Sequence, residues 1–305
     1  MKILPKLIVI VGPTASGKSD LAVKIAKKFN GEIVSADSRQ IYRGMDIGTA
    51  KPSKKKLAAV KHRLINIRNP NQDYSVGQYK KDAVMAINKI INAGKLPVLV
   101  GGTGLYINAV VKNLEFPKVK ENKKLRARLG EEIKNKGLDF VFKKLVRLDP
   151  EAAYIVDLKN PRRIVRALEV ALTSGKPFSA QRKAGKPLYD VLEIGIDIPR
   201  EKLKGKIAER IGWMVKDGLV EEVKKLVEKY GPNCKALDAI GYREIIDYLE
   251  GKISLAEAVG QINKNTRHYA RRQMTWFRKS KKARWFKNPR QAISFLRQSF
   301  FCHPG

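Results

Sequence analysis

The stretch Gly12-Pro13-Thr14-Ala15-Ser16-Gly17-Lys18-Ser19 decides the fold of this chain. An apolar run at 7–11 precedes it, and apolar residues recur at helical spacing over 21–26. Strand, glycine-rich loop and helix in this order form the phosphate-binding pattern G-x-x-x-x-G-K-S. The loop N–H groups and the amino end of the helix attract a phosphate, Lys18 adds a positive charge, and the Ser19 hydroxyl can bind Mg²⁺. The sequence therefore predicts a phosphate or diphosphate site, against the alternative of a glycine turn that binds nothing.

Composition indicates a polyanionic partner. The 305 residues include 63 Lys+Arg and 29 Asp+Glu, a formal net charge of +34. Nucleic-acid phosphates attract such an excess, although a generally lysine-rich proteome is the alternative explanation. Cys234 and Cys302 lie far apart without histidines at metal spacing, which favours neither a zinc site nor a disulfide framework. Without a secretory signal or a long apolar stretch, we expect a cytoplasmic protein that contacts no membrane.

Alternating strands and helices predict an α/β fold with a mainly parallel sheet. A helix is expected over 79–93, ending at Gly94, and strands are expected at 7–11, 32–36, 64–67, 96–100 and 191–197. Ligands of open α/β sheets bind at the carboxyl ends of the strands. Asp37, which follows the second strand, should therefore face the same crevice as the phosphate loop.

A basic helical block interrupts this pattern. Residues 112–190 contain 20 Lys/Arg and 10 Asp/Glu, with helical patterns over 122–136, 137–146, 150–155 and 161–173. We therefore expect a core of residues 1–111 and 191–305 and an insertion domain at 112–190 that can move relative to it. Arg162 and Arg166 share one face of the last of these helices, where a solvated charged face is the ordinary interpretation.

The C-terminal region is helical and basic. Helical patterns cover 207–229, 236–250 and 254–279, and residues 258–305 carry 12 Lys/Arg and no acidic residue. Aromatic residues interleave with these charges, which suits RNA because bases stack on aromatic rings. The same aromatics can instead face a core, and we expect Trp276 and Phe277 to be buried with the arginines outside.

The residues after the strand at 96–100 help to distinguish an enzyme that cleaves ATP from one that releases a diphosphate. Kinases and ATPases with a phosphate loop use a second acidic residue to hold Mg²⁺, whereas this strand ends in Gly101-Gly102-Thr103-Gly104. Asp37 could supply that acid, so a P-loop nucleotide kinase, with ATP as the default ligand, stays an alternative. The other interpretation is that the loop holds a diphosphate that departs as a leaving group.

Seven motifs in order resemble the tRNA dimethylallyltransferase (tRNA isopentenyltransferase) family and span about residue 6 to about residue 287. The motifs are GPTASGKS (12–19), DSRQIYRGMDIGTAKP (37–52), HRLINI (62–67), GGTGLY (101–106), RRIVRALEV (162–170), AIGYREIIDYLEG (239–251) and TRHYARRQMTWFR (266–278). The resemblance implies a P-loop NTPase-like sheet flanked by helices, with a helical insertion domain. Because the chain has no C-x₂-C zinc-finger extension, we expect the bacterial type.

The resemblance also implies a reaction. The N6 amine of the adenosine on the 3′ side of the anticodon attacks C1 of dimethylallyl diphosphate, and pyrophosphate leaves. The substrates are tRNAs that read codons beginning with U and are bound through the anticodon stem-loop; Mg²⁺ is the cofactor, and the enzyme is expected to be a monomer. Two further alternatives stay open: an adenylate isopentenyltransferase that modifies free nucleotides, and an RNA-binding module with a vestigial loop.

Individual roles follow from matching positions. Asp37 matches the general base, although a carboxylate there could instead bind Mg²⁺ or cap the following turn. Thr103 matches a residue close to the reacting nucleotide, and Arg210 one that holds the pyrophosphate or transition state. Gln40 matches the residue that reads the adenine edge. Ser19 stands where many members have threonine, and it keeps the hydroxyl.

The matching positions also imply a tRNA-binding set. We expect the base to be splayed out into a channel through the core that the diphosphate enters from the other side. Arg39 receives no individual role within this set. The implied contacts are Asp37, Ser38, Arg39, Gln40, Thr103, Arg126, Arg162, Arg163, Ile164, Val165, Arg166, Ala239, Ile240, Gly241, Tyr242, Arg243, Arg271, Arg272, Gln273 and Arg278.

Overall fold

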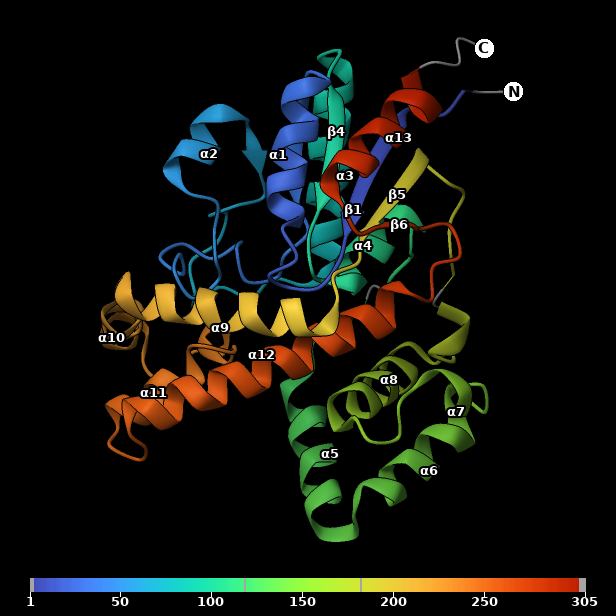
Figure 1. Cartoon of the computed structure of the whole chain (residues 1–305). Coiled ribbons are helices and arrows are strands. Elements are labelled where there is room, and N and C mark those ends of the chain that lie inside the picture. Colours follow the sequence, from blue (N-terminus) through green and yellow to red (C-terminus); the bar gives the residue numbers. More distant parts are fainter. Residues whose placement is uncertain (1–2, 118, 182, 302–305) are drawn as a thin grey trace. The chain divides into compact units, whose positions relative to one another are not determined.

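The chain forms two compact units in the computed structural model, which describes residues 3–117, 119–181 and 183–301 (Figure 1). One unit comprises residues 1–111 and 187–305, and the other comprises residues 112–186. The insertion was predicted to extend to residue 190. Tyr189 belongs to the first unit because it is buried in the core beside the sheet, and its hydroxyl donates to Asn88 of helix α3 (Val76–Asn92).

A six-stranded sheet, parallel throughout, forms the centre of the first unit. Its strand order is β3-β2-β4-β1-β5-β6, and the phosphate loop follows the inner strand β1. The predicted α/β fold with a mainly parallel sheet is confirmed. The strands are β1 (Lys6–Val11), β2 (Gly31–Ser35), β3 (His62–Arg63), β4 (Leu96–Val100), β5 (Asp190–Ile196) and β6 (Arg284–Phe286).

Helices cover both faces of this sheet (Figure 1). Side chains of β1 alternate between the faces, so that Val9 packs towards α3 and α4 (Gly104–Val111) while Ile8 packs towards α1 (Lys18–Lys28) and α13 (Pro289–Phe301). A strand buried on both faces needs a continuous apolar run, which explains the sequence of β1. On the α3 side, Tyr79 stacks on Tyr106 and donates to the carbonyl of Ser35 at the end of β2.

A third layer of helices lies at the carboxyl ends of the strands (Figure 1). Its core packs around the segment from Ile41 to Met45. The helical pattern predicted over 207–229 is divided into two helices, because Gly218 adopts a left-handed conformation (φ 96°). The layer comprises α9 (Arg200–Lys216), α10 (Leu219–Tyr230), the 3₁₀ turn η2 (Lys235–Leu237), α11 (Arg243–Leu249) and α12 (Leu255–Phe277).

Three other sequence predictions need correction. The strand expected at 64–67 lies instead at β3, because Leu64 and Asn66 have positive φ values of 62° and 57° that extended strands do not allow. The helix expected over 236–250 begins only at Arg243, after η2 and the positive-φ residue Gly241. Beyond residue 279 the chain forms β6 and α13, which the sequence did not indicate; residues 302–305 lie outside the described part.

The second unit is a small helical bundle with a core of its own. Residues such as Leu129, Val141, Leu145 and Ile164 are buried in it. Asn122 and Asn160 cap two of its helices by accepting bonds from backbone N–H groups three residues ahead. Its elements are α5 (Lys123–Lys136), α6 (Leu138–Leu148), α7 (Ala152–Ile155), α8 (Pro161–Ser174) and the 3₁₀ turn η1 (Ser179–Gln181).

One short helix completes the description. Helix α2 (Lys54–Ala59) joins the region after Asp37 to β3. Among the residues that the structure describes, none of the helices combines the length and the apolar character that a bilayer crossing requires.

Candidate active site

The phosphate loop is shaped to surround a ligand. Ala15 and Gly17 take positive φ values of 61° and 84°, and α1 begins directly after Gly17. Lys18 folds back over the loop and donates from Nζ to the carbonyl of Pro13 at 3.0 Å. The Ser16 hydroxyl is buried, and within the described residues it has no hydrogen-bond partner. A buried polar atom without a partner is costly, and a phosphate oxygen in the loop would satisfy it.

The charged forms of two side chains at the loop, Lys18 and Arg210, are destabilised. Burial and the nearby Arg210 guanidinium lower the pKa of Lys18 to about 8, although the Asp37 carboxylate acts in the opposite direction. Burial also lowers the pKa of Arg210, whose Nη1 lies 3.4 Å from the Thr14 hydroxyl. An anion between Lys18 and Arg210 would relieve this repulsion. The structure therefore brings Arg210, from α9, to the loop where the resemblance expected it.

Asp37 lies at the end of β2 and organises the turn that follows it. Its Oδ1 accepts from the N–H groups of Arg39 at 2.9 Å and Gln40 at 3.4 Å. Thr103 joins the same turn, because its hydroxyl accepts from the N–H of Ser38 at 3.0 Å and donates to the Ser38 hydroxyl at 3.3 Å. The carboxylate thus caps a turn, as one alternative expected, and it also lines the cavities described next.

Two cavities of the first unit meet at Asp37. A phosphate cavity of about 110 Å³ lies over the phosphate loop. A helix cavity of about 290 Å³ extends from the Asp37 turn to side chains of α9 and α12 and to residues 238–243. The lining residues common to both are Thr14, Asp37, Thr49, Ala50 and Arg210. A ligand in one cavity and a ligand in the other would therefore approach each other beside the Asp37 carboxylate.

Two glutamines of the predicted tRNA-binding set are held by hydrogen bonds with backbone groups. The Gln40 amide lines the phosphate cavity and donates to the carbonyls of Thr49 and Ala50 at 3.3 and 3.4 Å. Gln273 of α12 is buried, accepts from the N–H of Thr14 at 2.8 Å and donates to the carbonyl of Gly102 at 2.9 Å. Gln273 therefore ties the phosphate loop to the end of β4.

Residues 239–243 border the helix cavity. Tyr242 is fully buried, and just before this segment the carbonyls of Ala236 and Asp238 accept from the Arg39 guanidinium. Arg243 is exposed and pairs with Asp238 at 3.0 Å. The remaining members of the predicted segment, Ala239, Ile240 and Gly241, line the cavity with Tyr242 and Arg243.

The outer surface of α12 is strongly basic. Arg271 lines a groove of about 640 Å³ beside α9, together with Arg267, Lys264 and Arg200. Arg272 lies over the ring of Tyr269, and Arg278 pairs with Asp197 at 3.4 Å. Phe277 is buried as predicted, whereas Trp276 is half-buried. The interleaved pattern therefore divides between core aromatics and surface cations.

Two arginines of the second unit, Arg126 and Arg166, are engaged within it. Arg126 makes two bonds of 2.8 Å to the fully buried carboxylate of Glu169, and Arg166 donates to the same group. Ile164 is buried, so its side chain contributes to packing. Arg163 is exposed on the same helix, α8. No pattern in the sequence indicated this network, because Glu169 resembles any other charge on an amphipathic helix.

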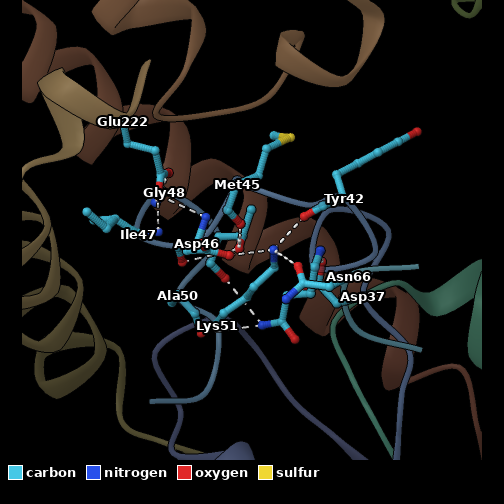
Figure 2. Close-up of polar contacts among 12 residues, drawn as sticks. Asp37, Tyr42, Met45, Asp46, Ile47, Gly48, Ala50, Lys51, Asn66 and Glu222 are labelled. Carbon is cyan, nitrogen blue, oxygen red and sulfur yellow. Dashed lines mark hydrogen bonds and ion pairs between the residues drawn. The ribbon is translucent and has the colours of Figure 1, made fainter. Parts of the chain in front are cut away.

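Sequence reasoning singled out neither Lys51 nor Glu222, which Figure 2 shows around the segment 46–51. The Lys51 side chain is only 5% exposed, and its ammonium group donates to Asp46 Oδ1, to the Asn66 side chain and to the carbonyl of Tyr42. Burial lowers the pKa of Lys51. In the sequence, Lys51 was marked only by lying within the long motif at 37–52, and the motif does not assign a role to this lysine.

The chain is similar to known proteins along most of its length. A family described as IPP transferase matches residues 40–280. The tRNA dimethylallyltransferase of Acetivibrio thermocellus is 45% identical over 286 residues, which cover 92% of this chain and 91% of that protein. The tRNA dimethylallyltransferase of Carboxydothermus hydrogenoformans is 42% identical, covering 98% and 97%.

Solved structures are similar along most of the chain. The full-length tRNA isopentenylpyrophosphate transferase of Bacillus halodurans matches with a TM-score of 0.72 and 38% identity, covering 96% of both chains. A eukaryotic dimethylallyltransferase acting on tRNA matches with a TM-score of 0.77 and 29% identity, covering 90% of this chain and 70% of that one. On the extent of these matches, the chain belongs to the IPP transferase family.

Proposed function

We propose that the protein transfers a dimethylallyl group from dimethylallyl diphosphate to N6 of the adenosine on the 3′ side of the anticodon. The substrates would be tRNAs that read codons beginning with U. The observation that carries the proposal is the meeting of the phosphate cavity and the helix cavity at Asp37. The first cavity suits the diphosphate and the second a base splayed out of the anticodon loop. Family membership supports the same substrates.

The reaction needs three things from the protein. The bond from C1 to the diphosphate oxygen breaks as the bond from N6 to C1 forms, and N6 loses a proton. Asp37, at the shared wall, is placed to accept that proton. The leaving pyrophosphate gains charge, which Lys18, Arg210 and the loop N–H groups are arranged to stabilise. The Thr103 hydroxyl holds the Asp37 turn in place.

Magnesium fits this donor set. Ser19 and Asp37 both line the phosphate cavity and offer a hydroxyl and a carboxylate oxygen. Within the described residues there is no cluster of three or more acidic, histidine or cysteine side chains to form a cage, and Mg²⁺ at phosphates commonly takes few protein ligands. When bound, the ion would neutralise charge on the departing pyrophosphate.

The tRNA would be held by exposed cations of both units. Arg163 on α8 and Arg271, Arg272 and Arg243 in the first unit offer guanidinium groups to backbone phosphates. The proposal also takes the enzyme to be cytoplasmic and monomeric, and light scattering of the free and tRNA-bound protein would test the second point.

Incubation with a radiolabelled prenyl donor tests the function. We expect label to enter unmodified tRNA in the presence of Mg²⁺ and pyrophosphate to appear in equal amount. Label in AMP but not in tRNA would indicate the free-nucleotide enzyme. ATP turnover without a prenyl donor, lost in Lys18→Ala, would indicate a kinase or ATPase, and tight tRNA binding without product would indicate a binding module.

A further inference from the structure

One carboxylate outside the reacting groups holds the loop between the two cavities. Glu222, from α10, accepts from three successive backbone N–H groups: Asp46 at 2.9 Å and Ile47 at 2.7 Å to Oε2, and Gly48 at 3.1 Å to Oε1 (Figure 2). Its Oε1 also accepts from the Tyr242 hydroxyl at 2.7 Å. Hydrogen bonds to an ionised carboxylate are stronger than neutral ones, so four of them form a firm attachment.

The three N–H groups belong to a tight turn that has no other acceptor for them within the described residues. Ala50 N donates to the carbonyl of Ile47, and Lys51 N donates to the carbonyl of Asp46. The turn therefore resembles the first turn of a helix, where the leading N–H groups lack internal partners and favour a negative charge. Glu222 supplies that charge from a different element.

The far end of the same loop is strained and lies at the reaction site. Ala50 has a φ of 50°, a left-handed conformation that costs a residue with a Cβ atom energy and persists only where its surroundings enforce it. Ala50 lines both cavities, as does Thr49. The carbonyls of these two residues also hold the Gln40 amide. The conformation of the loop thus sets the wall where the two substrates would meet.

The side chains of Lys51 and Tyr242 also contact the 46–51 loop. Lys51 anchors the end of the loop through Asp46, Asn66 and Tyr42. Gly48 lies against the Tyr242 side chain, so close that an added Cβ atom would be 2.6 Å from the ring. Lys51 and Tyr242 thus restrain the loop, and Glu222 joins it to the helical layer through hydrogen bonds.

We propose that Glu222 is a positioning residue for the transfer reaction: it fixes the 46–51 loop, and through it the shared wall beside Asp37. The inference rests on the proposed function. Small displacements at such a wall misalign the attacking and departing atoms without removing either binding site. The expected signature is therefore a loss of turnover with little change in substrate affinity.

The test compares Glu222→Gln with Glu221→Gln. In Glu222→Gln an amide N–H₂ replaces one carboxylate oxygen and faces N–H groups that it cannot accept from. Glu221 precedes Glu222 in the first turn of α10 and is exposed, so its substitution removes the same charge from the same helix end without touching the loop. We expect Glu222→Gln to lower kcat about 10- to 100-fold, with KM for the donor and tRNA affinity within about threefold of wild type.

Amide hydrogen exchange supplies the readout that distinguishes positioning from general destabilisation. In Glu222→Gln, exchange should accelerate in a peptide covering 45–51 and stay at the wild-type rate in α3 and β1, while Glu221→Gln should match wild type in exchange and turnover. A wild-type kcat for Glu222→Gln would overturn the inference, as would a loss of turnover accompanied by faster exchange throughout the first unit. If the wild-type protein itself makes no prenylated tRNA, the proposed function fails instead.

Discussion

At the scale of the residue, the site depends on groups that the fold places under electrostatic stress. Burial and the Arg210 guanidinium disfavour the charge of Lys18, burial disfavours that of Arg210, and the Ser16 hydroxyl is buried without a partner among the described residues. Asp37 has two tasks, because it caps its own turn and faces both cavities. The free energy that this arrangement costs is offset when an anion binds, which is how pre-organised sites are built.

Asp37→Asn separates these two tasks. The amide keeps an oxygen that can accept from Arg39 N–H, so the turn should be retained, but it cannot take the N6 proton. We expect turnover to fall about 10²- to 10⁴-fold, the usual range for loss of a general base, while tRNA affinity in a filter-binding assay is unchanged. An unchanged rate would show that Asp37 is not the base.

The pKa of Lys18 predicts how pyrophosphate binding responds to pH. The group loses its charge in the free protein above about pH 8, so affinity for inorganic pyrophosphate should fall as pH rises beyond that value, by roughly tenfold per pH unit. Calorimetric titration of wild type and Lys18→Met with pyrophosphate over a range of pH checks this. Pyrophosphate itself changes its protonation in the same way in both experiments, so the difference between the two proteins reports Lys18 alone. A wild-type curve parallel to that of Lys18→Met would contradict the prediction.

The same shift has a consequence for stability with a definite sign. The unfolded chain keeps the Lys18 proton up to its ordinary pKa of 10.5, whereas the folded chain releases it at about 8. Between these values the unfolded state binds more protons, so this group makes the free energy of unfolding increase with pH. The increase should be missing from denaturant titrations of Lys18→Met.

At the scale of the element, hydrogen bonds from side chains decide where segments meet. Gln273 of α12 joins the phosphate loop to the end of β4, and Glu222 of α10 holds the 46–51 loop. The helices and strands themselves were largely predictable, since β1, β4 and α5 follow from apolar pattern and caps. The strand predicted at 64–67 was wrong, because an apolar pattern does not indicate that Leu64 and Asn66 adopt left-handed backbone conformations.

Glu169 should control the stability of the helical unit. Burial by itself would raise its pKa, but hydrogen bonds from Arg126, the Asn122 N–H and Arg166 together lower it below the ordinary 4.5. A lowered carboxyl pKa gives stability that is present above pH 4.5 and is lost as pH falls through the folded value. The pH dependence of this stability can be measured by unfolding the protein between pH 3 and pH 7 and monitoring hydrogen exchange in residues 123–174.

Glu169→Gln should remove this pH dependence. The variant leaves Arg166 without its charged partner and Arg126 with only Glu121, and it should cost about 1–3 kcal/mol at neutral pH. Glu121→Gln is the matched control, because Glu121 also pairs with Arg126 but is 43% exposed, and it should cost at most about 1 kcal/mol. Equal losses in the two variants would show that burial of Glu169 has no part in the effect.

At the scale of the whole molecule, part of the net charge of +34 is concentrated on one side of the first unit. The third helical layer lies at the carboxyl ends of the strands, where the cavities open, and the basic outer surface of α12 belongs to it (Figure 1). The basic surface and the candidate site therefore lie at the same edge of the sheet. Arg126 and Arg166 show the limit of counting charges, because they are bound to Glu169.

Salt dependence of tRNA binding tests this arrangement. The double variant Arg271→Gln, Arg272→Gln should weaken binding and reduce the slope of log K against log salt by roughly one for each phosphate that the protein no longer neutralises. Lys27 and Lys28 lie in the last turn of α1, at the amino edge of the sheet, and their double glutamine variant removes the same charge. If both pairs reduce the slope equally, the basic surface acts only through total charge.

The phosphate loop, the parallel sheet and the family could be predicted from the sequence, because they depend on local pattern and on long motifs. The sequence also placed Asp37 at the crevice, since strand ends of a parallel sheet share an edge. The folded structure was needed to show that Arg210 reaches Thr14, that Gln273 and Glu222 hold loops, and that Glu169 pairs with two arginines. Those outcomes depend on contacts between residues far apart in the chain, whose distances no local pattern encodes.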